Sequence, residues 1–304
     1  MANDPVKEER ASILNITIRA ASEPDGFSIV ICSFRNFAGT GEGTNVSQEQ
    51  IKDRVRQQFG ETSAAYAVSA THRSGNDLDR LVELSECQST FDALDIATGA
   101  GHTARSIAPL VSHVVISDLT PQMLDTARAE MQAAGIHNVS FRIADAEELP
   151  FSNEVFDLVT CRIAPHHFSN CQQFAREVSR VLKAGGLFLL IDSTAPEDDA
   201  LDQRLNEFEW RRDNSHVRSL KRSEWLQLLV DAGLEVERAE DFPKRHDFAD
   251  WTARSRMTEQ NRLDLEQWLL DAPEEFQHLL GFEIENGRLV AFTDQKTLFK
   301  CRKR

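Results

Sequence analysis

Residues 94–104 read LDIATGAGHTA, a short apolar run that ends in a glycine-containing turn and leads into a helical pattern. Gly99 and Gly101 allow the backbone to turn tightly and to approach a ligand closely. Ligands of open parallel sheets bind outside the carboxyl ends of the strands, so this turn is a candidate binding loop. Taken alone, the stretch also fits a dinucleotide site or a strand-to-helix turn without a ligand.

Strand-like and helix-like segments alternate downstream of this turn. The segments expected to be strands are 93–96, 113–117, 139–143, 155–161, 187–191 and 234–239. The segments expected to be helices are 103–110, 121–134, 171–182, 199–212 and 222–232. This alternation predicts βαβ units in an α/β fold, with a parallel sheet, right-handed crossovers and helices on both faces.

The sequence before the sheet predicts a small helical cap, residues 47–90. A variable, poorly ordered extension, residues 1–46, is expected to precede it. Ser47 and Gln50 suit a capping box, which starts a helix that we expect Gly60 to end. Two short helices, 64–68 and 77–85, are expected to follow. The extension holds one apolar run, FSIVICSF at 27–34, which is its only expected strand.

The segment after the predicted core, residues 91–248, is expected to form a lid, a hairpin and the final strand, residues 249–304. Residues 249–280 look helical and carry Trp251, which either lines an apolar acceptor pocket or belongs to a packed lid. Asn286-Gly287 stands between two alternating segments, 282–285 and 288–292, and predicts a tight β-hairpin.

Composition disfavours several kinds of partner. The 304 residues include 49 acidic and 34 basic side chains, a formal charge of -15, whereas nucleic acids and anionic membranes attract basic surfaces. We expect a small-molecule partner instead, and a monomer or homodimer. The basic end at residues 300–304 is interpreted as a solubilising terminus.

Cysteine spacing and hydropathy indicate the compartment. Five cysteines without a CxxC pair argue against a disulfide scaffold and a zinc site, and they favour reduced thiols in the cytoplasm. No apolar run approaches the ~20 residues of a membrane span. We therefore expect a cytoplasmic chain with no membrane span and no metal site.

Two acidic residues follow the next expected strands. Asp118 can accept hydrogen bonds from two ribose hydroxyls, or it can cap the helix that follows. Asp145 can accept a hydrogen bond from an adenine amine, or it can belong to an acidic surface loop.

Five segments in this order resemble class I S-adenosylmethionine-dependent methyltransferases, in particular the methyltransferase type 11 group around the ubiquinone/menaquinone methylases. They are LDIATGAGHTA, VVISDLTPQML, FRIADAEELPF, FDLVTCRIAPHHF and EVSRVLKAGGLFLLID. The resemblance covers about residues 55–239. Ala97 replaces the first glycine usual in the first motif, and Ala184 replaces the proline usual before the double glycine; both substitutes are small.

The resemblance implies a Rossmann-like, doubly wound, mostly parallel seven-stranded sheet with an antiparallel last strand, and S-adenosylmethionine as cofactor. The expected cofactor-binding residues are Tyr66, Asp95, Ala97, Thr98, Gly99, Gly101, Asp118, Leu119, Asp145, Ala146 and Arg162. By the same resemblance Asp118 holds the ribose, Asp145 and Ala146 bind the adenine, and Arg162 lies beneath the sulfonium.

The expected reaction is an in-line methyl transfer to an oxygen or carbon of a small molecule, for which the protein supplies alignment and sometimes a base. His167, and less strongly His166, follow the fourth strand and are the candidate bases, because imidazole titrates near neutral pH. His216 and Arg218 are weaker candidates for contacting substrate. The rival interpretations are a nicotinamide-dependent oxidoreductase and a non-catalytic S-adenosylmethionine-binding protein.

Overall fold

The computed structural model describes residues 46–68 and 76–304, and of residues 63–68 it describes only the helical backbone. The apolar run at 27–34 and the side chain of Tyr66 therefore lie outside the described residues. Among the described residues, no helix is long and apolar enough to cross a membrane.

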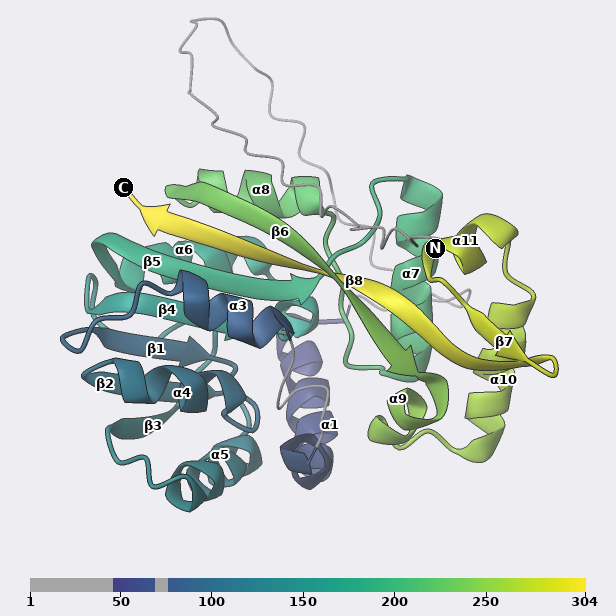
Figure 1. Cartoon of the computed structure of the whole chain (residues 1–304), viewed down its shortest axis with the longest axis horizontal. Helices are drawn as coiled ribbons and strands as arrows, with labels where there is room; N and C mark the ends of the chain where they lie inside the picture. The colour runs from purple at the N-terminus through teal and green to yellow at the C-terminus, as the bar shows by residue number, and fades with distance from the viewer. Residues whose placement is uncertain (1–45, 69–75) are drawn as a thin grey trace, which may run out of the picture.

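Within these ranges one sheet of eight strands forms the centre of the molecule (Figure 1). Its order is β3-β2-β1-β4-β5-β8-β6, and β7 pairs with β8 beyond this path. The strands are β1 Asp92–Ile96, β2 His113–Asp118, β3 Val139–Ile143, β4 Phe156–Arg162, β5 Leu182–Ser193, β6 Leu234–Asp247, β7 Glu283–Glu285 and β8 Arg288–Lys303. Strands β1 to β5 pair in parallel, whereas β8 runs antiparallel between β5 and β6. The expected Rossmann-like, mostly parallel α/β sheet with an antiparallel last strand is confirmed, but the described residues form eight strands instead of seven, because β7 adds to β8.

Helices cover both faces of the sheet. They are α1 Gln48–Val68, α3 Asn76–Leu84, α4 His102–Ile107, α5 Pro121–Ala133, α6 Cys171–Val181, α7 Asp199–Arg212, α8 Arg222–Asp231, α9 Phe248–Arg254, α10 Glu259–Leu270 and α11 Glu274–Leu279. Leu81 of α3 and Ala127 of α5 belong to one apolar cluster, and Phe174 of α6 and Trp225 of α8 to another, on the opposite face. The central strands β1, β4 and β5 are largely buried between these two clusters, as their apolar sequences predict, whereas β3, β6 and β7 are more exposed.

Helix α1 differs from the expectation. The capping box forms, because Ser47 N–H donates to Gln50 Oε1 at 2.8 Å and Gln50 N–H donates to Ser47 Oγ at 3.2 Å. However, the prediction that Gly60 ends the helix is wrong, since α1 continues to Val68. A helical glycine is unfavourable by only about 1 kcal/mol, and packing of α1 against α5 outweighs that preference.

Two strands are longer than expected. β5 includes Gly185-Gly186, and a Cβ at Gly186 would lie 2.9 Å from the Lys183 carbonyl oxygen, so only glycine fits there without a shift. β6 extends to Asp247 rather than residue 239 because β8 offers it an equally long antiparallel partner. Together β6 and β8 extend beyond the parallel strands toward α9 and α10 (Figure 1).

The segment expected to form a lid packs against α7 around a third apolar cluster. That cluster includes Phe208, Trp251, Leu265, Phe276 and Phe292. The hairpin between β7 and β8 forms as predicted, and both Asn286 and Gly287 have positive φ, as a two-residue type I′ turn requires. Most lid aromatics are therefore core residues, which favours a packed lid over an apolar acceptor pocket.

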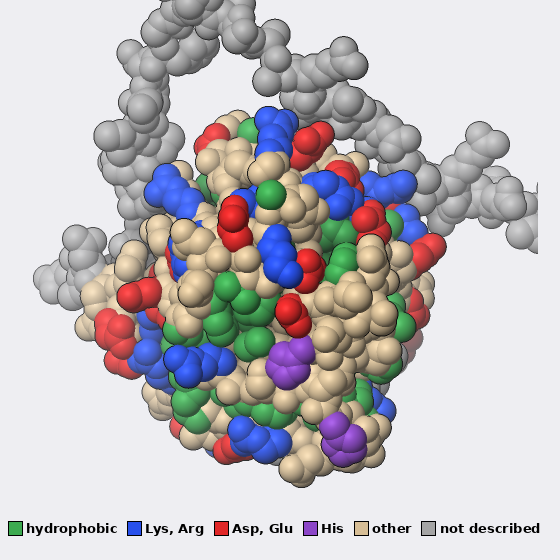
Figure 2. All heavy atoms as spheres, turned by 90° about the vertical axis from the view of Figure 1, so that its left-hand side faces the viewer, with side chains coloured by type: hydrophobic (Ala, Val, Ile, Leu, Met, Phe, Trp, Pro, Cys, Tyr) green, Lys and Arg blue, Asp and Glu red, His purple; other side chains and the backbone are tan. Residues whose placement is uncertain are grey.

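The basic end of the chain is part of β8 rather than a loose tail. Lys300 and Arg302 both pair with Glu86 and Glu237, and Lys303 pairs with Glu154. On the face that contains the C-terminus, basic and acidic side chains are mixed, as Figure 2 shows. These residues therefore tie the last strand to its neighbours.

Candidate active site

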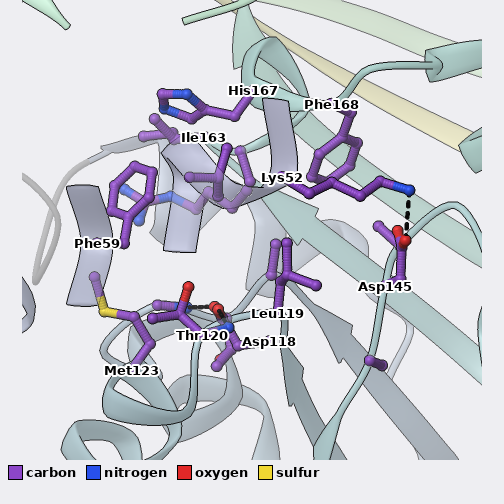
Figure 3. Close-up of a pocket in the computed structure, with 18 of the residues that line it drawn as sticks. Lys52, Phe59, Asp118, Leu119, Thr120, Met123, Asp145, Ile163, His167 and Phe168 are labelled. Atoms are coloured by element: carbon purple, nitrogen blue, oxygen red, sulfur yellow. Dashed lines mark hydrogen bonds and ion pairs between the residues drawn. The ribbon is translucent and has the colours of Figure 1, made fainter. Parts of the chain in front are cut away.

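A cavity of about 120 Å³ lies at the carboxyl ends of β1, β2 and β4, beneath helix α1 (Figure 3). Parallel strands all end at this edge, so the loops that follow them meet around one space. Its walls come from the loops after these strands, from the loop after β3 and from α1. The lining residues used below are Lys52, Phe59, Ala97, Thr98, Gly99, Asp118, Leu119, Met123, Asp145, Ala146, Glu147, Arg162, Ile163, His167 and Phe168.

The loop after β1 is held from below by a buried carboxylate. Asp95 accepts hydrogen bonds from Thr98 Oγ1 at 2.5 Å and from Thr160 Oγ1 at 2.7 Å. Burial raises its pKa to about 6, although these hydrogen bonds oppose the shift. Asp95 is 1% exposed and is not among the cavity's lining residues, so it shapes the loop from beneath.

The two glycines of this loop do different things. Gly99 lines the cavity with φ +57, and a Cβ there would meet nothing within 4 Å, so the loop leaves open space above it. Gly101 has φ +84 and precedes α4, where a Cβ would lie 3.0 Å from Met131 and 3.1 Å from Ala127. Gly101 is thus needed for helix packing and is not among the lining residues.

Asp118 connects the end of β2 to this loop. Its Oδ2 accepts the Gly99 N–H at 2.9 Å and its Oδ1 accepts the Thr120 N–H at 2.8 Å (Figure 3). Burial raises its pKa to about 6, against the lowering effect of these amide hydrogen bonds. Thr120 is the N-cap residue of α5 and no side chain caps the helix, so the Thr120 bond to Asp118 orders the turn before the helix while Asp118 lies at the cavity.

Helix α1 contributes Lys52 to the cavity, a residue that no sequence motif marks. Lys52 Nζ lies 2.6 Å from Asp145 and 3.2 Å from Glu147, as the dashed line in Figure 3 shows for Asp145. Glu147 in turn accepts hydrogen bonds from the backbone and side chain of Ser169. Asp145 is therefore in a charged network across the cavity mouth and not in a loose surface loop.

The opposite wall is apolar and includes a strained residue. Phe59 and Met123 face the cavity from α1 and α5, with Ile163 beyond them (Figure 3). Ile163 has φ +56, a conformation that β-branched residues rarely adopt, and its N–H donates to the Ile191 carbonyl at 2.7 Å. Such strain is of order 1–3 kcal/mol and persists where surrounding contacts fix the backbone.

A second cavity of about 60 Å³ adjoins the first. Phe59, Ile163 and His167 line both cavities, so these three side chains form the boundary between them. The remaining lining residues of the second cavity are His166, Ser193, Glu209, Arg212, Lys244, His246, Trp251, Arg254, Asp294 and Lys296. In contrast to the expected apolar pocket, this wall is mostly polar and charged.

The two histidines after β4 have different partners. His166 Nδ1 lies 2.6 Å from Asp192 Oδ1, and a carboxylate there fixes the proton on Nδ1 and leaves Nε2 as an acceptor. His167 Nδ1 lies 3.0 Å from the Ser215 carbonyl oxygen, and its ring centroid lies 4.3 Å from that of His166. Burial, together with the neighbouring His166 ring, lowers the pKa of His167 to about 4.

The loop at 213–218 supports this pair from behind. The His166 carbonyl accepts the N–H groups of Val217 and Arg218 at 2.8 and 3.0 Å. His216 is buried against Asn206 Oδ1 at 2.9 Å, and the Arg218 side chain pairs with Asp202 and Glu224. Neither His216 nor Arg218 is among the lining residues of the two cavities.

Most of the residues expected from the sequence meet at the first cavity. Those lining it are Ala97, Thr98, Gly99, Asp118, Leu119, Asp145, Ala146, Arg162 and His167. Arg162 also pairs with Asp77 of α3 at 2.7 Å. Asp95 and Gly101 lie behind this wall, and His166 lines the second cavity.

The residues that sequence reasoning missed come from outside the strand-end motifs. Lys52 and Phe59 belong to α1, for which the sequence predicts only a capped helix of the N-terminal segment. Lys244, Asp294 and Lys296 lie on the long ribbon of β6 and β8, where alternation was the only available signal. No local motif marks them.

The first cavity offers acceptors that suit an adenine nucleoside. It offers carboxylates at the ends of two adjacent strand loops, Asp118 and Asp145, and open space above Gly99. Carboxylates accept hydrogen bonds from ribose hydroxyls and adenine amines, which is the donor set such a ligand presents. Within residues 46–68 and 76–304, no three His, Cys, Asp or Glu side chains gather in a way that could hold a metal ion.

Comparison with known proteins gives concordant matches. Residues 94–190 match the family model described as "Methyltransferase domain". The uncharacterized methyltransferase YcgJ of Bacillus subtilis is 33% identical over 247 residues, which cover 81% of this chain and 98% of that protein. The ubiquinone/menaquinone biosynthesis C-methyltransferase UbiE of Pseudomonas aeruginosa is 33% identical over 168 residues, 52% of this chain and 65% of that protein.

Solved structures agree. The structure of a candidate methyltransferase from Bacillus halodurans superposes with a TM-score of 0.74 at 41% identity, covering 75% of this chain and 99% of that one. The structure of Bacillus subtilis YcgJ gives a TM-score of 0.73 at 34% identity, with 75% and 98% coverage.

Proposed function

Since this chain belongs to the class I S-adenosylmethionine-dependent methyltransferases of the methyltransferase type 11 group, we propose that it methylates a small molecule bound in the second cavity. The observation that carries the proposal is the shared boundary of the two cavities at Phe59, Ile163 and His167. A group transfer needs its two reactants in contact with water excluded, and adjoining cavities provide that arrangement.

The first cavity is the proposed cofactor site. When bound, S-adenosylmethionine supplies an electrophilic methyl group on a sulfonium. Asp118 would accept the ribose hydroxyls, and Asp145 and the Ala146 backbone would bind the adenine. Arg162, anchored by Asp77, would hold the floor of the site at the end of β4.

The proposed general base is His166, paired with Asp192. The carboxylate orients the ring and would stabilise the positive charge that the ring gains on accepting a proton from an oxygen or carbon acid. The sequence instead favours His167 as the base. Its low pKa of about 4 makes it a weak proton acceptor, so we assign it to the boundary, where it positions the acceptor.

Two rival functions are less well supported. A nicotinamide-dependent oxidoreductase would use the glycine loop but would have no need for the histidine pair at the boundary. A non-catalytic S-adenosylmethionine-binding protein would have no need for the second cavity or for the His166–Asp192 pair. The UbiE relative methylates carbon in ubiquinone/menaquinone biosynthesis, according to its name, and oxygen and carbon acceptors both remain within the proposal.

The test is a label-transfer assay. The protein is incubated with methyl-labelled S-adenosylmethionine and fractions of a small-molecule extract, and label in new small molecules is measured against Asp118→Ala. The proposal predicts transfer in at least one fraction and its loss in the variant. Label that stays on the cofactor in every fraction, while the cofactor binds, would support the non-catalytic alternative.

A further inference from the structure

Ile163 directly follows β4, and its backbone is strained. Its φ of +56 lies in the left-handed region, where a Cβ crowds the carbonyl oxygen that follows it. Strain of this kind clusters at functional sites, where the surrounding structure fixes the backbone. Within residues 46–68 and 76–304 no other β-branched residue has a positive φ; the other non-glycine residues that do are Glu86, Ala97, Glu154, Arg256 and Asn286.

The backbone on both sides of Ile163 is held in place. Its N–H donates to the Ile191 carbonyl oxygen at 2.7 Å, which continues the pairing of β4 with β5 one residue past Arg162. On the other side, the His167 N–H donates to the Ala164 carbonyl oxygen at 2.9 Å. The neighbouring contacts therefore impose the strained conformation, and this conformation fixes the direction of the Cα–Cβ bond of Ile163.

The Ile163 side chain lies at the boundary between the two cavities. It lines both of them, as do Phe59 and His167 (Figure 3). The Phe59 and His167 rings meet edge to face with their centroids 4.9 Å apart, and His167 Nδ1 lies 3.0 Å from the Ser215 carbonyl oxygen. The boundary thus consists of two rings in contact and one branched side chain whose backbone is fixed.

A β-branched side chain makes this boundary stiff. Two heavy atoms on Cβ restrict χ1, so Ile163 has little freedom to swing aside. A glycine would remove the backbone strain at this position, yet the chain carries a branched residue there. Among the described residues, only Phe59, Ile163 and His167 line both cavities, so a group that passes from one cavity to the other lies against them.

We propose that Ile163 sets the size of the group that S-adenosylmethionine can carry on its sulfonium, admitting methyl and excluding longer alkyl groups. This inference rests on the proposed function, because it takes the first cavity as the cofactor site and the boundary as the path of the transferred group. Each carbon beyond methyl must displace the branched side chain, and the fixed backbone of Ile163 opposes that displacement. Ile163 is therefore a specificity-determining residue for the methyl donor, separate from the proposed base.

The test compares cofactor analogues that differ only in the sulfonium substituent. S-adenosylmethionine, its S-ethyl analogue and its S-allyl analogue are titrated by calorimetry into the full chain, beside S-adenosylhomocysteine, which carries no substituent. In wild type we expect the two larger analogues to bind about 10-fold or more weakly than S-adenosylmethionine, the usual effect of forcing extra carbons into packed space. The measurement needs no acceptor, so it does not depend on which molecule the protein methylates.

Variants assign the effect to Ile163. Ile163→Ala and Ile163→Gly should each bring the affinity for the S-allyl analogue at least about 10-fold closer to that for S-adenosylmethionine. Ile163→Val keeps the branch at Cβ and should retain most of the wild-type ratio. Ile284→Ala is the matched control, because Ile284 lies on β7, is exposed and lines neither cavity. It should keep the wild-type ratio.

Chemical denaturation tests the backbone separately. Ile163→Gly should unfold at a higher denaturant concentration than Ile163→Ala, because glycine adopts a positive φ without strain. In regular helices and strands glycine is the less stable of the two residues, so the expected order is the reverse of the ordinary one. Because both variants lack the isoleucine branch, the lost packing largely cancels in the comparison.

The outcomes separate this inference from the proposed function. If neither S-adenosylmethionine nor S-adenosylhomocysteine binds wild type, the proposed function fails, and the size limit fails with it. If both bind while the larger analogues bind equally well, or if the ratio is unchanged in both Ile163→Ala and Ile163→Gly, only the size limit at Ile163 is overturned. A denaturation midpoint of Ile163→Gly at or below that of Ile163→Ala would overturn the role of the strained backbone.

Discussion

Asp118 combines two roles, because it orders the glycine loop through Gly99 and faces the cavity as an acceptor. Replacing it with alanine should weaken S-adenosylhomocysteine binding by about 1.5–3 kcal/mol, the usual effect of losing charged hydrogen bonds. Calorimetry measures the change. Asp125→Ala, at an exposed carboxylate on α5 paired with Arg128, is the control and should bind normally. Equal affinities for the two variants would assign Asp118 to ordering the backbone of the loops alone.

The same carboxylate predicts a pH dependence. Burial raises the pKa of Asp118 to about 6, and only the ionised form accepts hydrogen bonds at both oxygens. Cofactor affinity should therefore be full above pH 6 and fall as the pH drops through about 6, by up to about 10-fold per unit. Asp118→Asn should flatten this profile, which titrations at pH 5 to 8 would measure.

The same kind of pKa shift makes the free energy of unfolding depend on pH in the opposite direction to cofactor affinity. Asp95 and Asp118 both have pKa values raised from 3.8 to about 6, so between these values the folded chain holds protons that the unfolded chain has released. Their contribution to the free energy of unfolding therefore grows as the pH falls from about 6 to about 4. Loss of binding near pH 5 would not come from unfolding driven by these two groups.

The histidine pair gives a prediction for turnover. His166→Ala should lower the rate of label transfer by about 10²–10⁴-fold, because it removes the proposed base, while cofactor affinity stays near wild type. Asp192→Asn should reduce the rate in the same direction by misplacing the proton on the ring. His167→Ala should act mainly on the acceptor concentration needed for half-maximal rate. Wild-type rates for all three would mean that transfer proceeds by proximity alone.

Among the elements, helix α1 shows how tertiary contacts override a local signal. Gly60 predicted a helix end, yet the helix continues, and a Cβ at Gly60 would meet only the flexible Gln122 side chain, at 3.5 Å. Gly60→Ala should therefore stabilise the fold by about 0.5–1 kcal/mol in chemical denaturation.

Gly101→Ala also adds a single methyl group, but we expect it to have the opposite effect on stability. Its φ of +84 and the close approach of Met131 and Ala127 leave no room for a Cβ. We expect destabilisation of about 1–3 kcal/mol in the same experiment. If both alanine variants shifted stability in the same direction, the backbone argument for either glycine would fail.

The bounds of a strand could be predicted where an apolar run ends in a polar loop. They could be predicted less well where pairing with another strand determines how long the strand is. β1, β2 and β3 match the expected ranges within a residue or so; β1 and β2 carry the apolar signal of largely buried strands, whereas β3 is more exposed. The polar half of β6 carries no such signal, and its extension to Asp247 depends on pairing with β8, far along the chain. Local sequence does not encode that pairing.

At the scale of the whole molecule, the two cavities differ in how far the sequence could predict them. The first is built from loops that directly follow strands, so Asp118 and Asp145 could be identified from position alone. The second is assembled from α7, β6, α9 and β8, and its charges become neighbours only after the lid has packed. The local sequence around Arg212, or around Lys296, does not predict that these two side chains line the same cavity.

Among the described residues, the lining begins at Lys52 in the first cavity and at Phe59 in the second. Removing residues 1–45 should therefore leave S-adenosylhomocysteine affinity unchanged, measured by calorimetry beside the full chain. Reduced affinity or an insoluble product would show that the extension, which lies outside the described residues, takes part in the fold or the site.

The central claim is that the first cavity binds S-adenosylmethionine. Calorimetric titration of the full chain with S-adenosylmethionine, S-adenosylhomocysteine and NAD tests it most directly. The account predicts saturable binding of the first two in the micromolar range, about -8 kcal/mol, and none of NAD. Saturable NAD binding with no response to either sulfur compound would contradict it.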